Sequence, residues 1–217
     1  MTQRVFNKWL LILSAALICL ISSPTQAQQT VPVVEKPVQV RVIDYGGDLL
    51  ALLSQLPSSF DVTIGFEVDP LQPHSYVSFK LLDATFDDIL QAIVRAKPNY
   101  LWRKDGSFFE VYPRERTNAL LDTKIGSFQT KDATPTEAVN QVLSLYEVQS
   151  AIHLSDLQLA PNDSSLPSNG ARISIEARDI TLRHTLNLIA AQSGCKFWVF
   201  QRSGPRNQLF SITMANR

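Results

Sequence analysis

The residues able to do chemistry are few and scattered. Three histidines lie in a predicted loop, near the end of a predicted strand and on a predicted helix: His74, His153 and His184. None has the close i, i+4 spacing with which paired histidines hold a metal ion. Cys195 has no histidine at a known catalytic spacing and is most simply a buried strand residue. The histidines and this cysteine therefore predict neither a metal site nor a catalytic thiol.

The acidic residues have structural explanations. Asp87 and Asp88 fall in the first turn of a predicted helix, where carboxylates favour the helix dipole and can cap free N–H groups. Asp83, Asp132 and Asp179 recur in Asp-X-Thr motifs at intervals of about 50 residues, which indicates a repeated turn rather than one active site. The sequence has no P-loop, no Gly-X-Ser-X-Gly and no dinucleotide fingerprint. We therefore predict a protein that is not an enzyme and binds no cofactor.

One alternative stays open. A segment rich in Pro, Ser and Asn, Ala160 to Gly170, is predicted to be a mobile loop and follows His153 and Asp156. A small envelope hydrolase, or a binder of cell-wall glycan, would have to place its site there. Replacement of His153 or Asp156 would then abolish a defined activity.

The elements around the Asp-X-Thr motifs are strongly patterned. The stretch from Tyr76 to Pro113 predicts a strand, a helix capped by Thr85, a second strand, a two-residue turn at Asp105-Gly106 and a third strand. The stretch from Arg172 to Met214 repeats this order. Its strand Phe197 to Phe200 alternates two apolar faces, so we expect it to be covered on both sides.

The segments before these two stretches match each other more weakly. In the first, the predictions are a strand at Val38 to Val42, a turn at Asp44 to Asp48, a helix over by Pro57 and a strand at Val62 to Val68. In the second, they are a strand at Ile125 to Thr130, a helix at Pro135 to Tyr146 with a capping box of Thr134 and Glu137, and a strand within Ala151 to Leu159. The predicted fold class is α+β, as two tandem units of β-α-β-β-α-β-β type, 38–113 and 124–217, joined by a connector at 114–123.

The start of the chain predicts export. Arg4 and Lys8 precede a thirteen-residue apolar run, Trp9 to Ile21, and Thr25-Gln26-Ala27 offers a cleavage site. We predict a signal peptide at 1–27, a tether at 28–37 and a periplasmic mature protein, without a membrane span. The chain has 20 basic and 20 acidic residues, so losing two basic ones gives a net charge of about −2, which does not favour nucleic acid or an anionic membrane surface.

Aromatic residues are the remaining candidates for binding. They gather in the two predicted hairpins: Tyr100, Trp102, Phe108 and Tyr112 in the first, Trp198 and Phe200 in the second. One interpretation is that they pack in the core. The other is that a hairpin presents these six residues at an exposed edge, where another chain pairs with it.

The repeated pattern resembles the short N-terminal (STN) domain of secretins and TonB-dependent transducers. The matching residues are VSFKLLDATFDDIL to LWRKDGSFFEVYP, and ISIEARDITLRHTLNLIAAQSGCKFWVF to LFSITM. The resemblance implies an α+β domain that contacts other proteins, usually in front of an outer-membrane barrel or a secretin ring. No barrel strands and no secretin pore segment follow here, so we expect a separate subunit.

These observations together predict a function. We expect a periplasmic, non-enzymatic interaction module in an envelope assembly, such as an accessory subunit of a secretin, pilus, secretion or transducer complex. Its partners would be envelope proteins, a secretin or outer-membrane component among them, or further copies of itself. A purely structural spacer would instead have no saturable partner.

Overall fold

The computed structural model describes residues 40–115, 118–160 and 170–215. The predicted signal peptide and tether, and nearly all of the predicted loop after Ala160, lie outside the described residues. All described elements belong to one compact unit, Pro37–Arg217. We call residues 40–115 the first half and residues 118–215 the second half.

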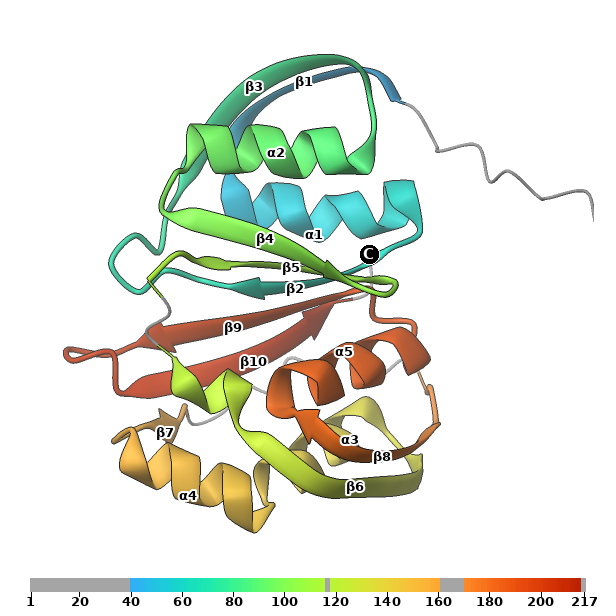
Figure 1. Ribbon diagram of the computed structural model, residues 1–217, viewed down its shortest axis with the longest axis vertical. Coiled ribbons are helices and arrows are strands. Elements are labelled where there is room, and N and C mark those ends of the chain that lie inside the picture. The colour runs from blue at the N-terminus through green and yellow to red at the C-terminus, as the bar shows by residue number, and fades with distance from the viewer. Residues whose placement is uncertain (1–39, 116–117, 161–169, 216–217) are drawn as a thin grey trace, which may run out of the picture. The chain divides into compact units, whose positions relative to one another are not determined.

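Helices and strands are mixed, and the predicted α+β class is confirmed (Figure 1). The first half contains β1 (Val40–Asp48), α1 (Leu49–Phe60), β2 (Thr63–Glu67), β3 (Tyr76–Ala84), α2 (Phe86–Ala96), β4 (Tyr100–Asp105) and β5 (Phe108–Pro113). The second contains the 3-10 helix η1 (Ala119–Asp122), β6 (Lys124–Ala133), α3 (Pro135–Leu143), α4 (Tyr146–Leu154), β7 (Gln158–Leu159), β8 (Ile173–Thr181), α5 (Leu182–Gln192), β9 (Phe197–Ser203) and β10 (Leu209–Ala215). No described helix is long and apolar enough to cross a membrane.

Both halves contribute to one six-stranded sheet, in the order β4-β5-β2-β9-β10-β7. Within each half a hairpin, β4–β5 or β9–β10, is extended by a parallel strand, β2 or β7. The two groups of three strands join where β2 runs parallel to β9, with Ile64 opposite Phe197 and Glu67 opposite Phe200. The sequence predicts the strands of each half but not this shared sheet.

The helices of the two halves cover opposite faces of the sheet, as Figure 1 shows with α1 and α2 above it and α3 and α5 below. One core forms among α1, α2 and the strands β2 and β5, and a second among α3, α5 and the strands β9 and β10. Strand β9 belongs to both, because Phe197 and Val199 enter the first core while Trp198 and Phe200 enter the second. The prediction that this strand is covered on both sides is confirmed.

The Asp-X-Thr motifs form the turns from strand to helix that the sequence predicts. Asp83, Asp132 and Asp179 end or nearly end β3, β6 and β8, with φ angles of 47°, 51° and 52°. This left-handed region is tolerated by aspartate better than by most residues. The threonine two positions later accepts a backbone N–H at the start of α2, α3 and α5. What recurs along the chain is therefore a backbone turn.

Two predictions near the first helix are wrong. Residues Asp44 to Asp48 are not a turn, since β1 continues through them in an antiparallel ribbon with β3. Tyrosine hydroxyls lie over its two glycines: a Cβ on Gly46 would lie 2.7 Å from the Tyr76 hydroxyl, and one on Gly47 2.8 Å from the Tyr45 hydroxyl. Helix α1 also does not end at Pro57 but includes this buried residue and closes at Asp61 in a left-handed conformation.

Predictions for three later segments, a strand, a helix end and a hairpin turn, are also corrected. Ala151 to Leu154 is helical, as the end of α4, and only Gln158–Leu159 of the expected strand is extended. The predicted helix from Pro135 to Tyr146 ends earlier, at Leu143 of α3, and Tyr146 begins α4. In the β4–β5 hairpin Asp105 pairs with Phe108, so the turn consists of Gly106 and Ser107, with Gly106 at φ 61°.

Candidate interaction surface

Three of the six aromatic residues proposed as exposed are buried. Tyr100, Trp198 and Phe200 lie in the two cores, so their assignment to an exposed edge is wrong and the core interpretation holds for them. Tyr100 stacks at a tilt on Phe66, and its hydroxyl accepts the Asp69 N–H at 2.9 Å. The Trp198 indole donates to a side-chain amide at 2.7 Å. Each polar atom thus has a partner inside the fold.

The other three aromatics, Trp102, Phe108 and Tyr112, are half-buried. Trp102 lies beside Phe109, and Phe108 meets the ring of His184 edge to face. Tyr112 has guanidinium groups on its ring, with Arg103 and Arg183 each 5.9 Å from the ring centroid. These contacts are all within the chain, and a role in binding a partner stays a prediction.

A buried cluster of charges connects the two halves. Arg183 of α5 donates to Glu67 of β2 at 3.0 Å and to Asp122 of η1 at 3.3 Å. Its Nε also lies 3.8 Å from Glu110 of β5. The side chains of Arg183, Glu67 and Glu110 are at most 2% exposed. Because the carboxylates lie on strands of the first half and the arginine on a helix of the second, the cluster fixes one half against the other.

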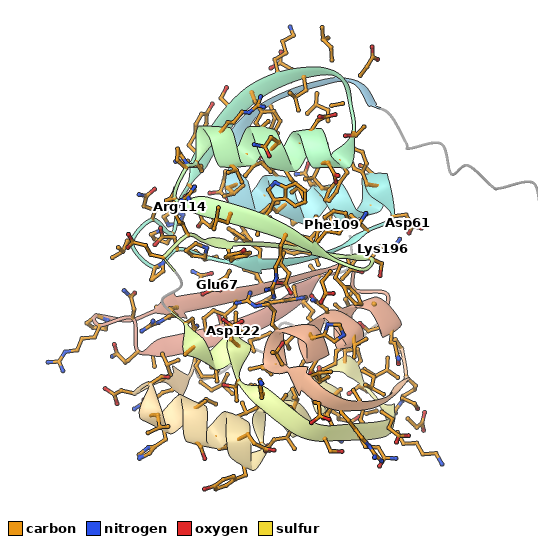
Figure 2. The ribbon with its side chains drawn as sticks, in the orientation of Figure 1. Asp61, Glu67, Phe109, Arg114, Asp122 and Lys196 are labelled. Atoms are coloured by element: carbon orange, nitrogen blue, oxygen red, sulfur yellow. The ribbon has the colours of Figure 1, made fainter. Side chains whose placement is uncertain are left out.

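Further polar groups complete the cluster. Asn187, one turn after Arg183, donates to Glu110 at 3.0 Å and accepts from the Trp198 indole. Arg103 reaches Glu110 from the adjacent strand at 2.6 Å. Two members are labelled in Figure 2, Glu67 at the end of β2 and Asp122 at the end of η1. The members of the cluster satisfy one another, so its role is structural.

The residues at the centre of this cluster are absent from the sequence-based predictions, although the sequence contains signals for them. Glu67 and Glu110 are single carboxylates within otherwise apolar strands, TIGFE and FFEVYP. Arg183 and Asn187 lie at i and i+4 and therefore share a face of α5. Lone charges in buried strands need a partner, and a polar pair on one helix face can supply it.

A second, exposed ion pair links the halves at another point. Lys196, just before β9, binds the carboxylate of Asp61, which follows α1, and Figure 2 shows the two residues side by side. The hydrogen bond from Lys196 holds the pKa of Asp61 below its usual value. His184 of α5 likewise lies 3.1 Å from Asp105 at the tip of the first hairpin.

The two outer edges of the sheet differ in charge. Strand β4 forms one edge, and its last three residues, Arg103, Lys104 and Asp105, are exposed. Charges, lysine above all, keep an edge strand from pairing with other chains. The opposite edge is formed by β7 and β10, and β10 has the sequence LFSITMA without a charged residue.

The β10 edge is also open over most of its length. Among the described residues, β7 pairs only with Leu209 and Phe210 of β10. From Ser211 to Ala215 no described strand lies on this side of β10. We call residues 211–215 the open edge. An uncharged, unpaired edge strand is a template for pairing with another chain.

Exposed apolar side chains accompany this edge. Leu159 of β7, opposite Phe210, is 52% exposed. Helix α4, which precedes β7, exposes Tyr146 by 83% and Leu154 by 85%. Within the described chain α4 has no counterpart in the first half, where α1 leads directly to β2. The second half thus exposes apolar side chains on β7 and on α4.

The residues proposed for a hydrolase or glycan site are placed as follows. His153 and Asp156 lie at and just after the end of α4, and both are exposed. Cys195 is buried. Among the described residues no three His, Cys, Asp or Glu side chains are grouped to hold a metal ion.

Comparison with known proteins gives no neighbour: no family model, no curated protein and no solved structure matches the chain.

Proposed function

We propose that this chain is an exported, non-enzymatic protein–protein interaction module in a bacterial envelope assembly, as an accessory subunit of a secretin, pilus, secretion or transducer complex. The observation that carries the proposal is the open edge of β10, residues 211–215, which has no charge and, on the side away from β9, no described strand. Partners of other classes need a cleft or a charged surface, whereas a sheet edge binds an extended protein segment.

The mechanism is strand addition. A partner strand laid against the open edge takes up the free N–H and C=O groups of β10, and these hydrogen bonds supply affinity. Exposed Leu159 of β7, opposite Phe210, supplies apolar contact area beside it. Arg103 and Lys104 disfavour the same event at the other edge of the sheet.

The proposed location in the bacterial envelope is supported by the start of the sequence. The basic and apolar pattern before Ala27 is that of a secretory signal. The resemblance of the repeat to the STN domain adds secretins and transducers as the class of assembly to examine first.

The test is crosslinking of the protein in its native envelope, followed by purification and mass spectrometry of the partners. The unmodified chain should recover envelope proteins, and Thr213→Lys should lose them because it places a charge on the open edge. Gln129→Lys is the matched control, since it adds the same charge at an exposed strand position of β6. Equal recovery with both variants would move the binding surface elsewhere, and recovery of neither a partner nor a second copy would overturn the proposal.

A further inference from the structure

We propose that the open edge binds a second copy of this chain, with the two β10 strands antiparallel around a two-fold axis at Thr213. The inference rests on the proposed function, because it names an occupant for the same edge. It makes the shared sheet continue from one molecule into the next.

The position of β7 sets the register. Because β7 pairs with Leu209 and Phe210, and no other strand among the described residues lies on this side of β10, an incoming strand has Ser211 to Ala215 available. Antiparallel pairing of this five-residue stretch with its own copy is centred on Thr213. Ser211 then lies opposite Ala215 of the second copy, and Ile212 opposite Met214 of the second copy.

The side chains match in this register. Ile212 and Met214 point into the core beneath the sheet, so the pair continues an apolar layer across the junction. On the other face, half-buried Thr213 meets its own copy, and threonine pairs are favourable between antiparallel strands. Small residues, Ser211 and Ala215, flank it. No charge meets a like charge, which is the usual obstacle to pairing a strand with itself.

The backbone groups match as well. The carbonyls of Gln208 and Phe210 accept from Gln158 and Ala160 at 2.8 Å each, so they point toward the β7 side. Since alternate residues of a strand point the same way, Ile212 and Met214 also direct their N–H and C=O groups to that side. The two Ile212–Met214 pairs therefore form hydrogen-bonded pairs, and Thr213 forms the close, non-hydrogen-bonded pair between them.

The chain already joins two groups of strands edge to edge, through a parallel pair. At the internal junction β2 lies against β9, with backbone hydrogen bonds of 2.9 Å from Ile64 to Lys196 and from Val68 to Phe200. Pairing of two copies through β10 is also favoured over pairing through the other edge, because β4 would present Arg103 and Lys104 there. The open edge is thus the place where this architecture can add one more junction.

The first experiment is a cysteine crosslink in the full chain. Thr213→Cys is made together with Cys19→Ser, and Cys195 is kept because it is buried. A non-hydrogen-bonded pair brings the Cα atoms to about 4.5 Å, within reach of a disulfide. Mild oxidation should give a covalent dimer, and its yield should exceed that of Lys104→Cys on β4 by at least about tenfold, because pairing raises the effective thiol concentration.

The second experiment tests the register. Ser211→Cys and Ala215→Cys, each alone, should crosslink poorly, whereas an equal mixture of the two should form the heterodimer. Sedimentation of the parent, which carries only Cys19→Ser, should show a reversible dimer that Thr213→Lys abolishes while its thermal unfolding stays cooperative. A Thr213→Cys yield equal to that of Lys104→Cys, or a parent that stays monomeric at high concentration, overturns the second-copy inference.

The outcomes separate this inference from the proposed function. If Thr213→Cys does not dimerise but Thr213→Lys still loses envelope partners, the interaction module stands and its occupant is a different protein. If the dimer forms and crosslinking in the envelope recovers only this chain, self-pairing stands and the heterologous assembly is wrong.

Discussion

Corresponding strands of the two halves differ in burial and in their position in the sheet. Strand β4 and strand β9 both follow a capped helix and both open a hairpin. The residues Phe197 to Phe200 of β9 are all buried, because β9 lies between β2 and β10. In β4, Arg103 and Lys104 are exposed. The same element therefore serves as a junction in one half and as a protected edge in the other, and side-chain chemistry makes the difference.

The parallel strands β2 and β7 show the same contrast. All five residues of β2 are buried, while the two residues of β7 are exposed. The first half has a complete third strand and the second half, over the described residues, a short one.

The largest predicted effect comes from breaking the charged cluster at the junction. Arg183→Met should lower the free energy of unfolding by about 3–5 kcal/mol, because it removes the guanidinium that buried Glu67 binds and leaves Glu110 with Arg103 alone as its cation. Urea unfolding measures this. Arg178→Met, which removes an exposed arginine paired with Glu176, is the control and should change stability by less than about 1 kcal/mol. Equal effects would mean that the cluster does not hold the halves together.

The next effect concerns the contact between β2 and β9. A Cβ on Gly65 would overlap the Trp198 ring, so Gly65→Ala should cost about 1–3 kcal/mol through overpacking. Gly126→Ala is the matched control, since the nearest neighbouring atom to its added Cβ is 3.7 Å away, on the flexible side chain of Glu147. The two variants are compared by thermal unfolding. A Gly65→Ala protein as stable as Gly126→Ala would contradict the close approach at this junction.

A smaller loss of stability is expected from removing the N-caps of the corresponding helices α2 and α5. Thr85→Ala in α2 and Thr181→Ala in α5 should each cost about 1 kcal/mol, as losses of an N-cap usually do. Their dependence on pH should differ. Thr85 hydrogen-bonds Asp88 and holds its pKa below the usual value, whereas Thr181 caps toward His184 without a carboxylate.

The sign of this pH effect follows from linkage. A lowered folded-state pKa stabilises the protein above the pKa of Asp88 in the unfolded chain, and this stabilisation disappears as the pH falls through the lowered value. The cost of Thr85→Ala should therefore shrink in acid while the cost of Thr181→Ala stays constant. Unfolding of both variants between neutral pH and the acid limit of stability measures the difference.

The last predicted effect is a change of slope at alkaline pH and belongs to Tyr100, whose counterpart in β9 is Phe197. Burial raises the pKa of Tyr100 to about 12 from 10.0. Because the unfolded chain loses this proton first, stability should fall as the pH rises between those values. Tyr100→Phe should flatten this part of the stability profile. An unchanged slope in the variant would assign the alkaline loss to another group.

Local patterns predict local structure well in this chain. The Thr85, Thr134 and Thr181 caps are predicted correctly because a cap depends on residues three positions apart. The alternation of Phe197 to Phe200 correctly predicts a strand with two buried faces. Predictions from glycine and proline alone are wrong at Gly46 and Pro57, where pairing with β3 and burial against the core decide the conformation.

Long-range pairing could not be predicted in the same way. The β2–β9 junction joins residues such as Ile64 and Phe197, and neither carries a mark of its partner. Strand β9 is buried by that junction, so the exposure of Trp198 and Phe200 could not be judged from one hairpin. Glu67 and Arg183 do carry a signal of their contact, because an isolated charge in an apolar pattern needs a partner of opposite charge when it is buried.

The double role of β9 has a consequence for the order of folding. The core of the first half includes Phe197 and Val199, which come from the end of the second half. The first half therefore cannot close its core during synthesis until β9 has left the ribosome. The chain therefore stays incompletely folded until late in translation, and its N-terminal core forms only together with its C-terminal one.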